Sequence, residues 1–156
     1  MLVDLEKLLE ILNGERKKGK KVVFTNGCFD IIHAGHVDYL EKVKSLGDIL
    51  VVGLNSDHSV KRIKGEKRPI IPQEMRAKVL SSLKPVDYVV IFEEDTPAKL
   101  IEAIRPDVLV KGGDWPLEKI VGRDYVESYR GKVLTIPFEY DISTSQIIEK
   151  IIKLYC

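Results

Sequence analysis

The residues best suited to chemistry are two histidines that stand three positions apart in the stretch TNGCFDIIHAGHVDYL, residues 25–40. His33 and His36 are separated only by Ala34 and Gly35, in a chain that has 3 histidines. An apolar run precedes the stretch and a helical pattern follows it, so we expect the pair where a strand gives way to a helix. Gly35 would let a ligand approach the backbone, and a helix N-terminus favours an anion such as phosphate.

Two other interpretations of this pair stay open when only the residues are considered. Together with Asp30 and Cys28 the histidines could bind a metal, although zinc histidines on one helix are usually spaced i, i+4 and no CxxC completes the set. They could also serve only to cap the helix. The spacing by itself does not choose among phosphate binding, metal binding and capping.

A second candidate loop is KGGDW, Lys111–Trp115. Its paired glycines allow the backbone to approach a ligand, Lys111 supplies a cation and Asp114 an acceptor. Trp115, the only tryptophan, supplies a flat apolar wall. The alternative is a tight turn with a tryptophan in the core.

The elements that must position these residues alternate along the chain. Apolar runs predict strands at 21–25, 48–54, 87–92, 107–110 and 132–136. Helical spacing lies between them, and we expect helices to begin near Pro72, Thr96 and Ser143, the last with a capping box. The alternation predicts an α/β fold, a Rossmann-like doubly wound parallel sheet of about five strands. In such sheets ligands bind beyond the carboxyl ends of the strands.

The spacing of apolar residues also predicts which helix side chains face the core. The expected inward-facing residues are Met75, Val79 and Leu80 after Pro72, and Ile147, Ile148, Ile151 and Ile152 in the last helix. We expect residues 55–71 to form a polar loop. Its basic part, Lys61–Arg68, reads either as a solvated segment or as a lid that closes over phosphates.

The totals describe one domain spanning residues 1–156. The net charge is +1, so no broad field attracts nucleic acid or a membrane surface. The N-terminal stretch lacks the apolar core of a signal peptide, and Cys28 and Cys156 form no CxxC pair. We therefore expect a cytoplasmic protein with no nucleic-acid or membrane partner, and we keep a homo-oligomer as an alternative.

Four stretches in order resemble the HxGH nucleotidyltransferase superfamily, the cytidylyltransferase-like enzymes. TNGCFDIIHAGH is similar to the first signature and ISTSQII, residues 142–148, to the second. RPI at 68–70 and EMRAKVL at 74–80 fit the segments between them. Within the superfamily, DVLVKGGDW (107–115) and GRDYVESY (122–129) resemble the adenylyltransferase domain of ADP-heptose synthases.

The resemblance implies transfer of a nucleoside monophosphate from a nucleoside triphosphate to a phosphorylated acceptor, with release of pyrophosphate. For the ADP-heptose branch the substrates are ATP and a sugar 1-phosphate, heptose 1-phosphate. Glycerol-3-phosphate cytidylyltransferase and FMN adenylyltransferase activities are alternatives, but the cytidine-associated arginine is replaced here by Glu139, Tyr140 and Asp141. A nucleotide-binding module without turnover is the alternative from another class.

The resemblance also assigns three groups of site residues by motif match. The implied catalytic residues are His33, His36, Lys61 and Arg68. The implied nucleotide-binding residues are Thr25, Asn26, Gly27, Phe29, Asp30, Gly35, Arg76, Ser143, Thr144 and Ser145. The acceptor is expected at Lys111, Gly112, Gly113, Asp114 and Trp115. Mg²⁺ is the expected cofactor, carried by the triphosphate without direct ligation by the protein.

Overall fold

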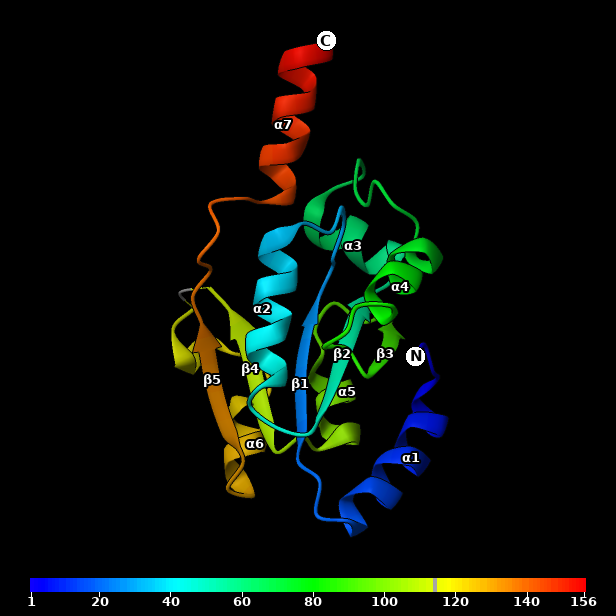
Figure 1. Ribbon diagram of the computed structural model, residues 1–156, viewed down its shortest axis with the longest axis vertical. Helices are drawn as coiled ribbons and strands as arrows, with labels where there is room; N and C mark the ends of the chain where they lie inside the picture. The colour runs from blue at the N-terminus through cyan, green and yellow to red at the C-terminus, as the bar shows by residue number, and fades with distance from the viewer. Residues whose placement is uncertain (114) are drawn as a thin grey trace.

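The computed structural model describes residues 1–113 and 115–156, in which strands and helices alternate (Figure 1). The strands are β1 (Val22–Gly27), β2 (Ile49–Asn55), β3 (Tyr88–Phe92), β4 (Val108–Gly112) and β5 (Lys132–Ile136). The helices are α1 (Leu5–Lys17), α2 (Ala34–Lys44), α3 (Asp57–Lys64), α4 (Gln73–Ser81), α5 (Ala98–Ile104), α6 (Arg123–Ser128) and α7 (Thr144–Tyr155), with a 3₁₀ turn, η1, at Leu117–Lys119.

Within these described residues the sheet has five parallel strands in the order β3-β2-β1-β4-β5. The predicted doubly wound parallel sheet is therefore confirmed. The chain moves outward from β1 through β2 to β3, then returns to pair β4 with the other edge of β1. The direction reverses between β1 and β4, and ligands of open α/β sheets bind at the carboxyl ends of the strands beside such a point.

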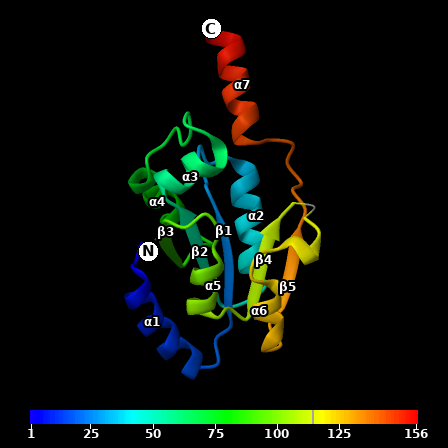
Figure 2. The ribbon, with the colours of Figure 1, turned by 180° about the vertical axis from the view of Figure 1, so that it is seen from behind.

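Helices cover both faces of the sheet, so every position of β2 is buried. The neighbouring strands are apolar on both sides, as strands covered on both faces are. One face packs against α1, α5 and α6, through side chains such as Leu8, Ile101 and Val126. The other packs against α2 and α4, through Leu40 and Leu80. Figure 1 views α2 in front of the sheet, and Figure 2 shows α5 and α6 from behind.

The structure corrects the expected polar loop at residues 55–71, because Asp57–Lys64 is helix α3. Ser56 caps this helix, and its hydroxyl oxygen accepts a hydrogen bond from the backbone N–H of Ser59 at 3.1 Å. Asp57 lies in the first turn and basic side chains lie in the last, an arrangement that suits the helix dipole. The signal for this short helix is therefore in its cap and charges, and not in apolar periodicity.

The inward face predicted for α4 is only partly correct. Leu80 is buried as expected, but Met75 is 62% and Val79 is 48% exposed. The face turned to the protein instead carries Arg76, Ala77 and Leu80. The prediction failed because the inward face contains a fully buried arginine, which a pattern of apolar residues does not mark.

The prediction that α7 packs on the core is wrong. In α7, all of which the structure describes, no residue is buried, and Ile151 and Ile152 are 49% and 54% exposed. The helix extends away from the body beyond the carboxyl edge of the sheet (Figures 1 and 2). Among the described residues, every helix is too short or too polar to span a bilayer.

Candidate active site

A cleft of about 480 Å³ lies at the carboxyl ends of the strands, where β1, β2 and β4 give way to their loops. The predicted site residues that line it are Asn26, Gly27, Phe29, Asp30, His36, Arg68, Lys111, Trp115, Ser143, Thr144 and Ser145. These residues come from both ends of the chain and from both sides of the switch point. The structure thus brings the two sequence signatures to one place.

Seven other predicted residues do not line this cleft: Thr25, His33, Gly35, Lys61, Arg76, Gly112 and Gly113. Thr25 is buried beneath it, where its hydroxyl lies 2.7 Å from the hydroxyl of Tyr39. Lys61 is exposed on α3. Asp114 lies outside the described residues.

Sequence reasoning missed several residues that line the cleft, among them Asn55, Lys64, Asp95 and Thr96. Cys28, considered above only as a possible metal ligand, also lines it. Lys64 is the most informative, because it ends α3 and adds a cation beside Arg68. Its position depends on a helix that the sequence analysis read as loop. A Ser-Asp cap followed by basic residues is the signal that could have found it.

The two histidines form a compact, ordered pair at the start of α2. His33 is the N-cap, and its Nδ1 accepts a hydrogen bond from the N–H of Gly35 at 3.1 Å. His36 Nδ1 accepts one from the N–H of His33 at 3.3 Å, and the two rings stack with centroids 3.9 Å apart. Because both Nδ1 atoms accept, the proton of each neutral ring is on Nε2, which leaves a donor on each ring.

Burial favours the neutral form of both imidazoles. It lowers the pKa of His36 to about 4, with the neighbouring His33 as a second, smaller cause. Burial also lowers the pKa of His33. A neutral His36 that lines the cleft and carries its proton on Nε2 can donate a hydrogen bond to an anion without giving up that proton.

Asp30 is an anchor for the loop that follows α3. Its side chain is fully buried, and its Oδ2 accepts from Arg68 Nε and from the N–H of Ile70, each at 2.8 Å. Its Oδ1 accepts from the N–H of Ile71 at 2.9 Å. Thr144 in the first turn of α7 donates its hydroxyl to the Asp30 carbonyl. One residue thus fixes Arg68 and the base of α7 beside the histidines.

Arg76 is buried, 1% exposed, and its guanidinium links the ends of β1 and β2. Its Nη1 donates to the carbonyls of Cys28 at 2.7 Å and Asn55 at 2.9 Å. Its Nε donates to the Ile71 carbonyl at 2.8 Å, and Nη2 pairs with Asp57 at 2.8 Å. The structure therefore places this predicted nucleotide-binding residue in the framework that holds the cleft.

Cationic side chains and helix N-termini make the cleft electrostatically positive. Lys64, Arg68 and Lys111 line it, and burial lowers the pKa of the half-buried Lys111. The predicted capping box of α7 is confirmed: Ser143 Oγ accepts from Gln146 N at 3.1 Å, and Gln146 Oε1 accepts from Ser143 N at 3.0 Å. The N-termini of α2 and α7 both lie at the cleft (Figure 1), so two helix dipoles favour an anion there.

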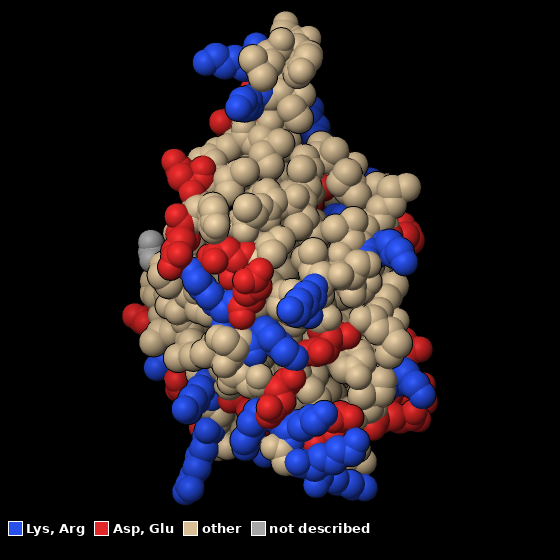
Figure 3. All heavy atoms as spheres, in the orientation of Figure 1, with Lys and Arg blue, Asp and Glu red and all other residues tan. Residues whose placement is uncertain are grey.

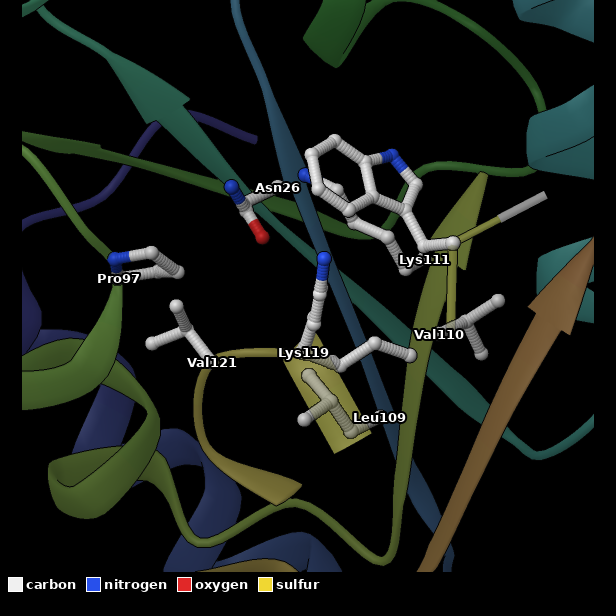
Figure 4. Close-up of a pocket in the computed structure, with 9 residues that line it drawn as sticks. Asn26, Pro97, Leu109, Val110, Lys111, Lys119 and Val121 are labelled. Carbon is white, nitrogen blue, oxygen red and sulfur yellow. The ribbon is translucent and has the colours of Figure 1, made fainter. Parts of the chain in front are cut away.

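A smaller cavity of about 110 Å³ opens beside the cleft and shares Asn26, Lys111 and Trp115 with it. Figure 4 shows the Asn26 amide and the Lys119 ammonium directed toward this space. Lys111 lies over the Trp115 ring, 5.7 Å from its centroid. Trp115 is 52% exposed, so the alternative of a core tryptophan is wrong.

Within the described residues, no three His, Cys, Asp or Glu side chains gather to hold a metal ion. The oxygens of Asp30 already accept hydrogen bonds from the neighbouring loop. The donors in the cleft are amides, cations and neutral rings, which suit phosphate oxygens. A magnesium ion would fit here when phosphate groups carry most of its ligands.

Comparison with known proteins connects this geometry to a family. The bifunctional protein HldE of Geobacter sulfurreducens is 58% identical over 97% of this chain, and that of Helicobacter pylori (strain Shi470) is 56% identical over 96%. The chain spans 31% of the length of each of these relatives. The lipopolysaccharide core biosynthesis protein of Thermoplasma volcanium is 31% identical, with a TM-score of 0.64 over 78% of this chain and 99% of that one.

A more distant structure shares only the fold. The pantoate-beta-alanine ligase of Francisella tularensis is 16% identical, with a TM-score of 0.58 over 98% of this chain and 78% of that one. The family model described as cytidylyltransferase-like matches residues 24–150, which include both signatures and every strand after the first residues of β1. The chain therefore belongs to the cytidylyltransferase-like family.

Proposed function

We propose that this chain is a nucleotidyltransferase that moves AMP from ATP to a sugar 1-phosphate, heptose 1-phosphate, and releases pyrophosphate. One observation carries the proposal. In a chain 58% identical to an HldE protein, His36, Arg68 and Lys111 line one cleft with the N-termini of two helices. That cleft is suited to a chain of phosphates, and the sequence resembles the adenylyltransferase domain that makes ADP-heptose.

In the proposed reaction a phosphate oxygen of the acceptor attacks the α-phosphorus of ATP. The bond from that phosphorus to the bridging oxygen breaks, and pyrophosphate leaves with the electron pair. His36 donates its Nε2 proton as a hydrogen bond to an oxygen that gains charge, and Arg68, held by Asp30, supplies a fixed positive charge. The protein's contribution is positioning and charge stabilisation, without a covalent intermediate.

We also propose Mg²⁺ as the cofactor. It would be carried by oxygens of the triphosphate and by water, because the cleft offers it no protein cage within the described residues. When bound, the ion neutralises charge so that an anionic acceptor can approach. Since the reaction draws on ATP, we propose that it takes place in the cytoplasm.

The residues before α7 support ATP over CTP. The cytidine-associated arginine is absent, and two carboxylates occupy that segment. Glu139 forms an ion pair with Lys42 at 2.8 Å, and Asp141 Oδ1 accepts a hydrogen bond from Gln146 Nε2 at 3.3 Å. These carboxylates thus have partners within the chain, and neither provides a cation for a cytosine carbonyl.

The test is pyrophosphate release from a panel of nucleoside triphosphates paired with sugar 1-phosphates, glycerol 3-phosphate and FMN. We expect the highest kcat/KM with ATP and heptose 1-phosphate. Faster turnover with CTP and glycerol 3-phosphate, or with ATP and FMN, would assign the chain to another branch. Nucleotide binding with no turnover for any pair would instead identify a binding module.

A further inference from the structure

One side of the cleft has no part in the reaction described above. It is formed at the carboxyl ends of β2 and β3, where Asn55, Asp95 and Thr96 line the cleft. The phosphates are assigned to the cations, to His36 and to the two helix N-termini. The acceptor also carries a sugar, whose hydroxyl groups need partners of their own. The unassigned residues are therefore the place to look for those partners.

Asn55 is the last residue of β2, and its side chain is buried in a defined orientation. The residue is 3% exposed, and its Nδ2 donates a hydrogen bond to Ser59 Oγ at 2.9 Å. Ser59 Oγ donates its own proton to the Glu94 carbonyl at 3.0 Å, so toward Asn55 it can only accept. This relay fixes which end of the amide is the nitrogen and which is the oxygen.

The oxygen end of this amide lacks a partner among the described residues. The backbone carbonyl of Asn55 accepts from Arg76 at 2.9 Å and Nδ2 is engaged by Ser59, but no described residue donates to Oδ1. Oδ1 is also not closed off from solvent. Because folded proteins rarely leave the polar atoms of a buried side chain unpaired, and Asn55 lines the cleft, this oxygen points to a ligand that supplies the missing bond.

The missing partner must be a hydrogen-bond donor, since an amide oxygen only accepts. Phosphate oxygens accept as well, so Asn55 is unsuited to the phosphate chain. β3 pairs with β2 so that Phe92 lies opposite Asn55, which brings the following loop to the same side of the cleft. In that loop Asp95 offers a carboxylate, and Thr96 Oγ1 accepts from the N–H of Ala98 at 3.4 Å and keeps its own proton to donate.

Hydroxyl groups of a sugar fit this mixture, because each can donate to one partner and accept from another. Figure 3 shows uncharged atoms over much of the body near the carboxyl ends of the strands, whereas charged side chains crowd the opposite end of this face. The cations of the cleft are thus a local set. Beyond them, the ends of β2 and β3 suit a neutral, hydroxyl-rich group.

We propose that Asn55 determines acceptor specificity, with its Oδ1 accepting a hydrogen bond from one hydroxyl of the acceptor sugar. The sugar ring then lies at the carboxyl ends of β2 and β3, within reach of Asp95 and Thr96, while its 1-phosphate is directed to the cations. The relay through Ser59 holds the amide oxygen ready before the sugar binds. This inference rests on the proposed function, because it concerns the acceptor of that reaction.

Adenine and ribose also carry donors, but the arrangement of the elements favours the sugar. The first turn of α7 and the loop before α2 meet where Thr144 donates its hydroxyl to the Asp30 carbonyl, after β1. The resemblance assigns the nucleotide to this meeting point. Asn55 instead stands where β2 leads into α3 (Figure 1).

Steady-state kinetics on Asn55→Leu tests the proposal, because leucine keeps the size of the side chain and removes the amide oxygen. We expect kcat/KM for the sugar 1-phosphate to fall roughly 10- to 100-fold through a higher KM, with the KM for ATP unchanged. His58→Ala, on the exposed side of the neighbouring helix, is the control and should match the wild type. Circular dichroism checks that each variant is folded.

A panel of monodeoxy sugar 1-phosphates then identifies the hydroxyl. With the wild type, one analogue should lose roughly 10- to 100-fold in kcat/KM relative to the parent sugar, because it leaves Oδ1 unpaired. With Asn55→Leu, that analogue and the parent should react equally well. Ser59→Ala releases the amide nitrogen and should reduce the difference between them, which provides a second variant if Asn55→Leu does not fold.

Three results would overturn the assignment of Asn55 while leaving the reaction in place. They are an unchanged KM for the sugar in folded Asn55→Leu, a rise in the KM for ATP instead, and recovery of the variant at high Mg²⁺, which would make Asn55 a metal ligand. Equal rates for every deoxy analogue with the wild type would also exclude it. A wild-type chain that turns over no sugar 1-phosphate at all would instead overturn the proposed function, and this inference with it.

Discussion

At the scale of single residues, the candidate chemistry depends on imidazoles that are neutral and held in one orientation. Each Nδ1 accepts a backbone N–H, and burial lowers the pKa of both rings. His36 lines the cleft, whereas His33 caps α2 and stacks on His36. The spacing of three residues therefore does two things. It lets one ring support the other, and it fixes which nitrogen of each ring carries the proton.

We expect His36→Ala to lower kcat with little change in the KM for ATP. Loss of one donor to a charge that develops at the barrier typically costs roughly 10²–10³-fold, about 3–4 kcal/mol. His33→Ala should cost at least as much, and should also lose about 1 kcal/mol of stability because it removes a helix cap. Steady-state kinetics on both variants, with circular dichroism for folding, measures this.

His58→Ala is the control for this experiment, because His58 is exposed on α3 and does not line the cleft. Its kcat should stay close to that of the wild type. Turnover of a folded His36→Ala enzyme at the wild-type rate would reduce the pair to a cap on α2.

The lowered pKa of His36 predicts how stability depends on pH. The folded chain holds this pKa at about 4, below the ordinary 6.5, so between these values the unfolded chain binds a proton that the folded chain excludes. The free energy of unfolding should therefore fall as pH falls from about 6.5 toward about 4. Urea denaturation at about pH 7.5 and about pH 5 should show a larger loss for the wild type than for His36→Gln. Equal losses would contradict the assigned burial.

At the scale of elements, the cleft is built from loops that buried polar side chains hold together. Asp30 fixes the segment from Arg68 to Ile71, and Arg76 joins the ends of β1 and β2 to α3. These contacts lie under the cleft, so the surface that would meet phosphates rests on a rigid base. The second wall, at the start of α7, is attached through the hydroxyl of Thr144, which donates to the Asp30 carbonyl.

Arg76→Met should destabilise the fold by about 3–5 kcal/mol, because it removes a fully buried cation from the partly exposed Asp57 and leaves buried carbonyls without donors. Chemical denaturation of the purified variant measures the change. Arg62→Met is the matched control: its ion pair with Asp95 is largely exposed and should be worth roughly 0–1 kcal/mol. Similar losses for both variants would show that the buried contacts of Arg76 carry no special weight.

The elements also show what could be predicted from the sequence. Buried strands and the capping box of α7 follow from local apolar runs and local hydrogen bonds, and both were predicted. α3 was missed because most of its eight residues are polar. The buried position of Arg76 was not anticipated because its partners are distant in the chain. The apolar stripe of α7 was assigned to the core because the spacing of apolar residues does not show whether the body of the chain covers them.

At the scale of the whole molecule, charge and topology meet at the carboxyl edge of the sheet. The net charge is only +1, so attraction for an anion comes from the local set of Lys64, Arg68, Lys111 and the two helix N-termini. In the order β3-β2-β1-β4-β5 the direction of winding reverses between β1 and β4. The two sequence signatures, from opposite ends of the chain, meet at the carboxyl end of this switch point. The fold therefore gathers positive charge at the cleft, although the chain as a whole is nearly neutral.

Few cations line the cleft, and a triphosphate brings more negative charge than they balance. We therefore expect turnover to vanish with excess chelator and to return when Mg²⁺ is added in excess of the chelator. A coupled pyrophosphate assay measures both. Full turnover in excess chelator would mean that the protein's own cations are sufficient and that the proposed cofactor is wrong.

The central position of β1 has a consequence for how the chain reaches this fold. One edge of β1 pairs with β2, which is near in sequence, and the other edge pairs with β4, which is distant. Beside β4, the Asp107 carboxylate accepts a hydrogen bond from the N–H of Val22, 85 positions away. Contacts so distant in sequence slow folding, and an unpaired edge on an apolar strand invites wrong partners. Until the segment with Asp107 and β4 pairs with β1, the chain holds a partial sheet with one edge of an apolar strand unpaired, and aggregation competes with folding during this interval.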